Sequence, residues 1–170
     1  MARRDYPLLQ VLAIKVKRVE AAELVVKEKQ QILQQEEEKL AQRKAERDRI
    51  LQHRTEKLQQ LRDELDHDTT TPKVQQMKVY LKVVDEKLKI EEKKVKEQQE
   101  RVDKAKGELE EAKRQLNIRR LEVDKVETHR VSWEKEKNKE DEIMAERAMD
   151  ELGTMIYSSR KRKDLESPEG

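Results

Sequence analysis

The sequence contains no cysteine and no phenylalanine, and only three glycines and three prolines among 170 residues. Sandwich, barrel and α/β domains need many turns and a thick apolar core, but only 34% of this chain is hydrophobic. These fold classes are therefore excluded. The absence of cysteine argues against a disulfide framework, which fits the cytoplasm. No stretch approaches the roughly 18 apolar residues of a membrane-spanning helix, so we expect no direct membrane insertion.

Charged residues, in contrast, are abundant, with 40 Lys and Arg against 38 Asp and Glu, for a net charge of +2. Because the two signs are interleaved, we expect no strong field for nucleic acid, and no nucleic-acid partner. The small net charge and the few breakers also argue against disorder. A chain rich in Ala, Glu, Lys, Leu, Arg and Gln is typical of long helices.

Apolar residues recur at alternating steps of three and four in two stretches, from Leu9 to Leu65 and from Val74 to Trp133. Heptads sustained over such lengths favour a coiled coil over a surface helix on a globular core. The predicted coiled-coil core comprises Leu12, Val19, Val26, Leu33, Leu40, Leu58, Leu61, Leu81, Leu88, Val102, Leu109, Leu116 and Val123.

A single clear break, from Asp66 to Pro72, separates the two stretches. Thr71 is predicted to be the N-cap, with Pro72 at the first helical position. Because the loop is short, we expect an all-α fold, an antiparallel coiled-coil hairpin whose second helix is longer. The expected bounds of the hairpin are residues 1–157, with helix one at about 7–66, a loop at 67–71 and helix two at about 72–157. A mobile charged tail at 158–170 follows, and Gly153 is expected to weaken the end of helix two.

Folding about residue 71 predicts a register in which paired residue numbers add to 142. This register pairs apolar residues with each other, as in Leu33 with Leu109 and Leu9 with Trp133. It also places polar residues of helix one opposite small ones, namely Glu37 opposite Ala105 and Gln30 opposite Ala112. A shift by one residue destroys all these matches.

No constellation for catalysis or cofactor binding is found in the sequence. There is no Gly-rich phosphate loop, and His53, His67 and His129 are scattered, so the chain is predicted to be neither an enzyme nor a cofactor-binding protein. Asp66, His67 and Asp68 offer a weak divalent-metal site, although a polar turn is the simpler interpretation. The basic run at 160–163 offers a contact for nucleic acid or acidic lipid, against the simpler interpretation of a solvated tail.

Several apolar residues fall outside the predicted core. A two-helix coil has no third element to cover them, so they are candidates for contact with another protein, although single exposed apolar residues can also be incidental. Those near the chain termini include Ile32, Ile118 and Leu121, and the last part of helix two has an apolar stripe that self-association into a dimer could bury instead. The candidate partner-binding residues are Val11, Ile14, Arg18 and Val25 near the termini, Val79, Tyr80, Val83 and Ile90 near the loop, and Met144, Met149 and Leu152 in the last segment.

The opening of the chain resembles the start of the YscO and FliJ stalk proteins of type III secretion systems. Within this family it is most similar to the chlamydial branch. The resemblance is carried by Tyr6-Pro7-Leu8, Val11-Leu12, Ile14-Lys15, Arg18 and Ala22-Glu23. The charged run from Trp133 to Glu142 is similar to a segment near the end of the family. These proteins are related in shape to the coiled-coil rotor subunit of ATP synthases.

The resemblance implies a cytoplasmic stalk, peripheral at the inner-membrane secretion apparatus, acting as a monomer or weak dimer. Its implied partners are the hexameric secretion ATPase, which the terminal end contacts, and the export-gate protein, which the loop end reaches. Such stalks can also bind secretion chaperones. The alternatives left open by the residues themselves are a coiled-coil scaffold without an ATPase partner, a chaperone-like hairpin and an RNA-binding rod.

Overall fold

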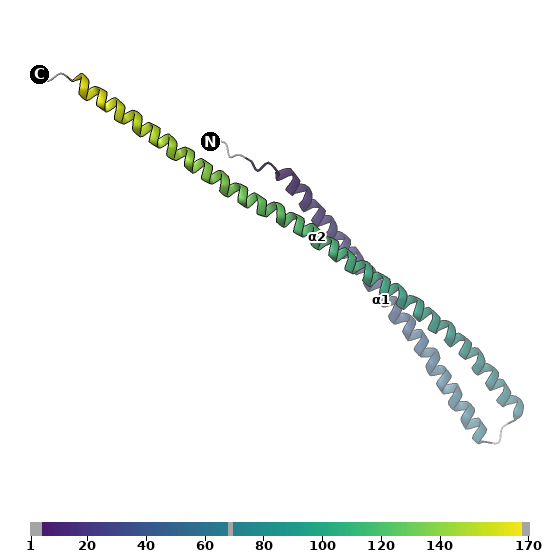
Figure 1. Ribbon diagram of the computed structural model, residues 1–170. Coiled ribbons are helices and arrows are strands. Elements are labelled where there is room, and N and C mark those ends of the chain that lie inside the picture. The colour runs from purple at the N-terminus through teal and green to yellow at the C-terminus, as the bar shows by residue number, and fades with distance from the viewer. Residues whose placement is uncertain (1–4, 68–69, 168–170) are drawn as a thin grey trace. The chain divides into compact units, whose positions relative to one another are not determined.

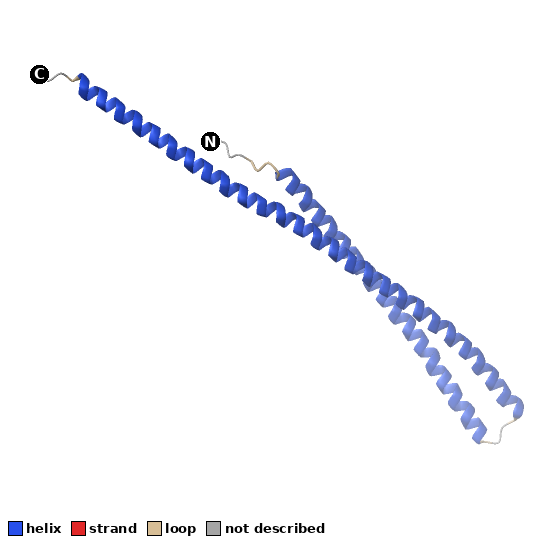
Figure 2. Cartoon of the chain, in the orientation of Figure 1, coloured by secondary structure: helices blue, strands red, loops and turns tan. Residues whose placement is uncertain are grey.

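The computed structural model describes residues 5–67 and 70–167 and contains two helices, α1 (Leu9–Asp66) and α2 (Thr71–Glu166) (Figure 1). Within the described residues there is no strand (Figure 2). The predicted all-α class, with a second helix longer than the first, is confirmed. The boundaries differ at the far end, where α2 continues to Glu166 instead of ending near residue 157, and residues 168–170 of the expected tail lie outside the described part.

The chain forms two compact units. The loop unit comprises Val19–Ile118, with the larger part of α1, the turn and the first half of α2. The terminal unit comprises Met1–Arg18 and Arg119–Gly170, which bring the start of α1 beside the second half of α2. Each unit has interhelical contacts of its own, and each is described separately below.

The helices form because little in the sequence interrupts them. No glycine or proline occurs in α1. Oppositely charged side chains one turn apart also form ion pairs along both helices, for example Lys39 with Glu36 at 3.1 Å and Arg130 with Glu134 at 3.1 Å. Such pairs support a helix locally, independent of what the helix packs against.

The turn between the helices is closed by backbone and side-chain caps. At the end of α1, Nδ1 of His67 donates to the carbonyl of Asp63 at 2.6 Å. At the start of α2, the carbonyl of Thr70 accepts from the amides of Lys73 and Val74 at 3.1 and 3.3 Å. Thr70 therefore occupies the cap position, and the prediction that Thr71 is the N-cap is wrong by one residue.

The core of the loop unit is formed mainly by one face of α2. Every buried residue of α2 lies in the predicted heptad series, at steps of three or four residues or, from Val84 to Gln98, of two heptads. Gln98 is the one buried polar residue in this series, and its amide donates both to the backbone carbonyl of Glu36, at 3.0 Å, and to the Glu36 carboxylate, at 2.5 Å. The buried residues of α2 are Val84, Gln98, Val102, Ala105, Leu109, Ala112 and Leu116.

The face that α1 turns toward α2 differs from the predicted heptad series at several alternate positions. Leu40 and Leu61 are buried as expected, but Gln30 and Glu37 are exposed. The residues that precede them, Lys29 and Glu36, are partly buried in their place. The expectation that Glu37 faces Ala105 and Gln30 faces Ala112 is therefore wrong, because the seam of α1 runs through the neighbouring positions.

The register differs accordingly. Lys29 forms an ion pair with Glu108 at 3.1 Å, and Glu64 forms one with Lys73 at 3.1 Å. In each pair the residue numbers add to 137, five less than the predicted 142. The hairpin of the loop unit is thus shifted by roughly one helical turn relative to the register inferred from the sequence.

In the terminal unit, Tyr6 anchors the start of the chain to α2. The Tyr6 side chain is buried, its ring packs edge-on against Trp133 with centroids 5.5 Å apart, and its hydroxyl is hydrogen-bonded to Nδ1 of His129 at 2.5 Å. Leu9, which the predicted register places beside Trp133, is 45% exposed. Tyr6, three residues before the predicted partner Leu9, supplies the ring that packs on Trp133.

Candidate partner-binding surfaces

The predicted coiled-coil residues lie between the helices to different degrees, and none of them is exposed. The buried ones are Leu12, Leu40, Leu61, Val102, Leu109 and Leu116. The partly buried ones are Val19, Val26, Leu33, Leu58, Leu81, Leu88 and Val123. The apolar residues left outside this seam define the candidate binding surfaces.

The α1 start surface, Val11, Ile14 and Arg18, lies in the terminal unit. All three residues are exposed, whereas Leu12, adjacent to Val11 in the sequence, is buried. Since residues three and four apart share a face of a helix, these residues form one short stripe. The stripe has two apolar members and one cation. Val25, a further candidate on α1, is exposed within the loop unit.

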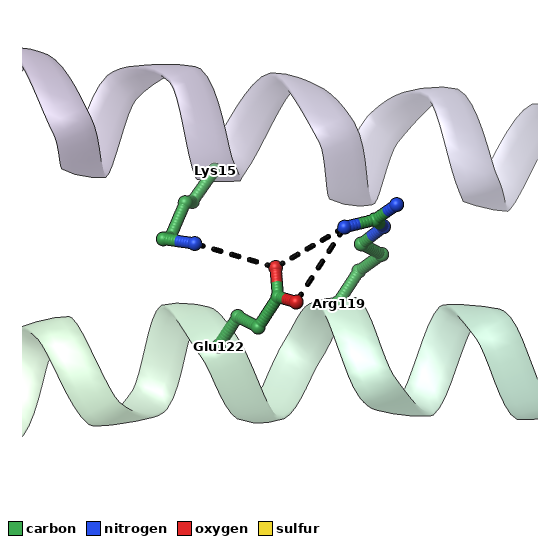
Figure 3. Close-up of polar contacts among 3 residues, drawn as sticks. All are labelled: Lys15, Arg119 and Glu122. Carbon is green, nitrogen blue, oxygen red and sulfur yellow. Dashed lines mark hydrogen bonds and ion pairs between the residues drawn. The ribbon is translucent and has the colours of Figure 1, made fainter.

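The start of α1 is held in place by a carboxylate on α2. Glu122 accepts from Nζ of Lys15 at 3.4 Å and from Arg119 at 3.4 and 3.5 Å (Figure 3). Partial desolvation raises the pKa of Glu122, but the hydrogen bonds from Arg119 and Lys15 outweigh it and leave the pKa below its ordinary value. The α1 start surface therefore lies next to Lys15, which an ionised Glu122 binds to α2.

The loop-end surface consists of Val79, Tyr80, Val83 and Ile90, all exposed on α2. Val79, Val83 and Ile90 follow one another at steps of four and seven and share one face of the helix. Val84, which directly follows Val83, is buried in the seam. The stripe therefore faces away from α1 and contributes little to the pairing of the helices.

Tyr80 differs from its neighbours because residues of α1 fix its ring. Its hydroxyl is hydrogen-bonded to Nε2 of His53 at 2.7 Å, and the two rings meet edge-on. Nζ of Lys57 lies 5.8 Å from the centre of the Tyr80 ring. A groove of about 380 Å³ lies here, lined by Lys57, Gln76, Met77 and Tyr80. The sequence marked Tyr80 only as an outward residue, and neither the groove nor the α1 residues that hold its ring could be found by periodicity alone.

The third surface is the overhang, residues 138–166 of α2 together with Ser167. Every residue in this range is exposed. The predicted candidates Met144, Met149 and Leu152 all lie here. The helix is unbroken through Gly153, where an added Cβ would meet no atom within 4 Å. The terminal unit thus presents a long stretch of helix that none of the described residues covers.

The described residues contain neither a cluster of metal-ligating side chains nor a membrane-spanning stretch. Within residues 5–67 and 70–167, no cluster of His, Asp and Glu side chains could hold a metal ion; Asp68, part of the weak metal motif, lies outside the described residues. Neither α1 nor α2 contains a stretch apolar and long enough to cross a bilayer in the residues described.

Comparison with known proteins identifies a family that matches most of this chain. Residues 3–163 match the family described as YscO-like protein. The solved structure of CT670 from Chlamydia trachomatis, a protein proposed to be a YscO homologue, is 43% identical in sequence and superposes with a TM-score of 0.90. The match covers 95% of this chain and 99% of that one. No curated protein matches the chain.

Proposed function

Because this chain belongs to the YscO-like family of type III secretion stalk proteins, we propose that it binds the hexameric secretion ATPase and connects it to the export gate. The observation that carries the proposal is the combination of this family with two exposed apolar stripes, one in each compact unit. The place of action is then the cytoplasmic side of the inner-membrane secretion apparatus. A coiled coil suits the role because it holds two binding surfaces on stiff helices.

The α1 start surface is the proposed contact for the ATPase. Val11 and Ile14 provide apolar contact area, and Arg18 provides a neighbouring cation of a type that is enriched at energetically important positions of interfaces. A stalk that binds the ring more tightly than the free ATPase subunit shifts the assembly equilibrium toward the ring. The full-length protein should therefore raise the ATPase activity or the hexamer population of its cognate enzyme.

The test is a titration of the ATPase with the full chain and with the variant Val11→Ser/Ile14→Ser. The variant should need at least about tenfold more protein for half-maximal stimulation, since losing two apolar anchors costs more than 1.4 kcal/mol of binding. Val131→Ser is the control, because Val131 is also an exposed valine of the terminal unit. Failure of the unmodified chain to stimulate or bind the ATPase at micromolar concentration and low salt would refute the proposal.

The loop-end surface is the proposed contact for the export gate. Its apolar stripe lies beside the groove whose wall includes the preorganised Tyr80 ring. A ring already fixed by His53 and Lys57 loses little conformational freedom on binding, which favours recognition. The combination of an apolar stripe and a fixed aromatic ring is therefore the part of the loop unit best suited to a protein partner.

This second contact can be tested with two substitutions of equal exposure. Val79 and Leu24 are 61% and 62% exposed, and both lie in the loop unit. Val79→Ser should weaken binding to the cytoplasmic gate domain by about fivefold or more, while Leu24→Ser should leave it unchanged. Both variants should keep wild-type helicity, as surface substitutions usually do. Equal effects of the two substitutions would show that the loop-end surface is not the contact.

A further inference from the structure

The overhang has an apolar stripe with no covering element among the described residues. At about 100° per residue, seven of its side chains fall within one sector of the helix of about 140°. Two alanines in the stripe allow close approach of another helix, and three methionines adapt to its side chains. The stripe consists of Met144, Ala145, Ala148, Met149, Leu152, Met155 and Ile156, all exposed.

Opposite charges flank this stripe at its two ends. Asp141 and Glu142 precede the stripe, and Arg160 and Lys163 follow it. By the same helical rotation, Asp141 and Lys163 lie in line with the stripe, while Glu142 and Arg160 lie along one edge of it. Lys161 points to the opposite face of the helix. At the C-terminal end Arg162 lies on the other edge of the stripe and Glu166 lies in line with it, so this end carries three basic side chains and one acidic side chain. The binding face is thus acidic at one end, apolar in the middle and net basic at the other end.

We propose that the overhang pairs with the overhang of a second copy of this chain, antiparallel and centred near Leu152. In an antiparallel two-fold arrangement each edge of the stripe meets the same edge of the other copy. Glu142 then lies beside Arg160 of the second copy, and Asp141 lies near Lys163 of the second copy. A parallel arrangement would place like charges together, which is unfavourable.

The contact is small and therefore weak. A single pair of short helical stripes buries less than the roughly 1,600 Å² of a standard stable interface, so we expect a dissociation constant of the order of 10 µM. Because the charges are exposed, salt should screen them and weaken the dimer. The inference uses only the overhang and is independent of the proposed contacts with the ATPase and the export gate.

Sedimentation equilibrium of the full chain at low salt tests the proposal. The wild type should dimerise with increasing concentration, and Leu152→Asp should raise the dissociation constant of the dimer at least tenfold. The charge-reversal variants Asp141→Lys/Glu142→Lys and Arg160→Glu/Lys163→Glu should each dimerise poorly, but an equimolar mixture should recover the dimer. Lys161→Glu is the control for the single variant Lys163→Glu, because it makes the same change on the opposite face, and it should dimerise more tightly than Lys163→Glu.

Orientation can be tested directly because the chain has no cysteine. Mixed Glu142→Cys and Arg160→Cys chains should form a disulfide with each other, and neither chain should crosslink with itself. Self-crosslinking of Asp141→Cys, which lies in line with the stripe, would indicate a parallel pair and overturn the proposal. A chain that stays monomeric at up to about 500 µM, some fifty times the expected dissociation constant, would also overturn it. If the monomeric chain loses ATPase binding on Leu152→Asp, the stripe serves that protein instead.

Discussion

Helix α2 passes through two opposite environments without a break. Between Val84 and Leu116 seven of its side chains are buried against α1, whereas from residue 138 to residue 166 all are exposed. The helix is continuous through both parts. Local interactions, such as the ion pair of Lys137 with Glu140 at 2.6 Å, therefore suffice to keep the chain helical. Tertiary cover decides which apolar side chains stabilise the protein and which are available to a partner.

The two parts also differ in the residues of their apolar stripes. The covered part places valine, alanine and leucine at the seam, residues with well-defined rotamers that pack specifically. The overhang uses three methionines among seven stripe positions, and methionine adapts to irregular surfaces. The difference fits a permanent contact in one part and a reversible contact in the other.

The largest expected difference is between two identical substitutions on α2. Leu109 is buried in the seam and Leu152 is exposed on the overhang. Leu109→Ala should lower the free energy of unfolding by about 2–3 kcal/mol, from lost burial and the cavity left behind. Leu152→Ala should change it by less than about 0.5 kcal/mol, as is usual for surface sites.

Urea unfolding followed by circular dichroism measures both variants at a concentration low enough to keep the protein monomeric. Equal losses for Leu109→Ala and Leu152→Ala would mean that the overhang is covered in the monomer. A negligible effect of Leu109→Ala would mean that the seam does not stabilise the loop unit. Either result would remove the contrast between the two parts of α2.

The sequence predicted the helices, their antiparallel pairing and the face of α2 that is buried. These features could be predicted because breakers are nearly absent and because apolar residues at Leu81, Leu88, Val95, Val102 and Leu109 repeat every seven positions. A period this regular defines one face of a helix without reference to any other part of the chain.

The register could not be predicted by the same means. A shift by one residue turns apolar side chains away from the partner helix, so the heptad pattern excludes it. A shift by one helical turn moves a pattern of alternating threes and fours onto itself, so most apolar pairings survive it. The seam of α1 does not resolve the ambiguity, because it includes charged residues such as Lys29, Glu36 and Arg43. Only the specific contacts, such as Gln98 with Glu36, distinguish the two registers.

The ends of the chain were also beyond the reach of periodicity. Tyr6 precedes the first helix and belongs to no heptad, yet its ring packs on Trp133. At the other end, residues 158–166 show no apolar period but are helical, because Lys, Arg, Asp, Leu and Glu contain no breaker until Pro168 in the sequence. The exposed candidate residues could be named from the sequence, but the fixed ring of Tyr80 and its groove depend on the fold.

A smaller effect is expected from two glycines, one in each part. An added Cβ would meet no atom within 4 Å at Gly107 or at Gly153, so alanine should fit at both sites and favour the helix by about 0.5–1 kcal/mol. Because residue 107 unfolds with the loop unit, Gly107→Ala should raise the melting temperature. Gly153→Ala should leave the melting temperature unchanged and slow hydrogen exchange only in the overhang. A higher melting temperature for Gly153→Ala would show that the overhang unfolds together with the hairpin.

The smallest effect concerns Glu36, a partly buried carboxylate of the kind that the fully exposed overhang lacks. Hydrogen bonds from Gln98 and then from Lys39 hold the pKa of Glu36 below its ordinary value, despite partial desolvation. A lowered folded-state pKa adds stability that is fully present above the unfolded pKa of about 4.3 and is lost as the pH falls through the folded value. The difference in melting temperature between wild type and Glu36→Gln should therefore be constant from pH 7 to about pH 5 and shrink below about pH 4. Glu37→Gln is the control, because Glu37 is the exposed neighbour and its replacement should have a smaller effect throughout. A difference that grew as the pH fell would mean that the protonated form of Glu36 is the one that the fold stabilises.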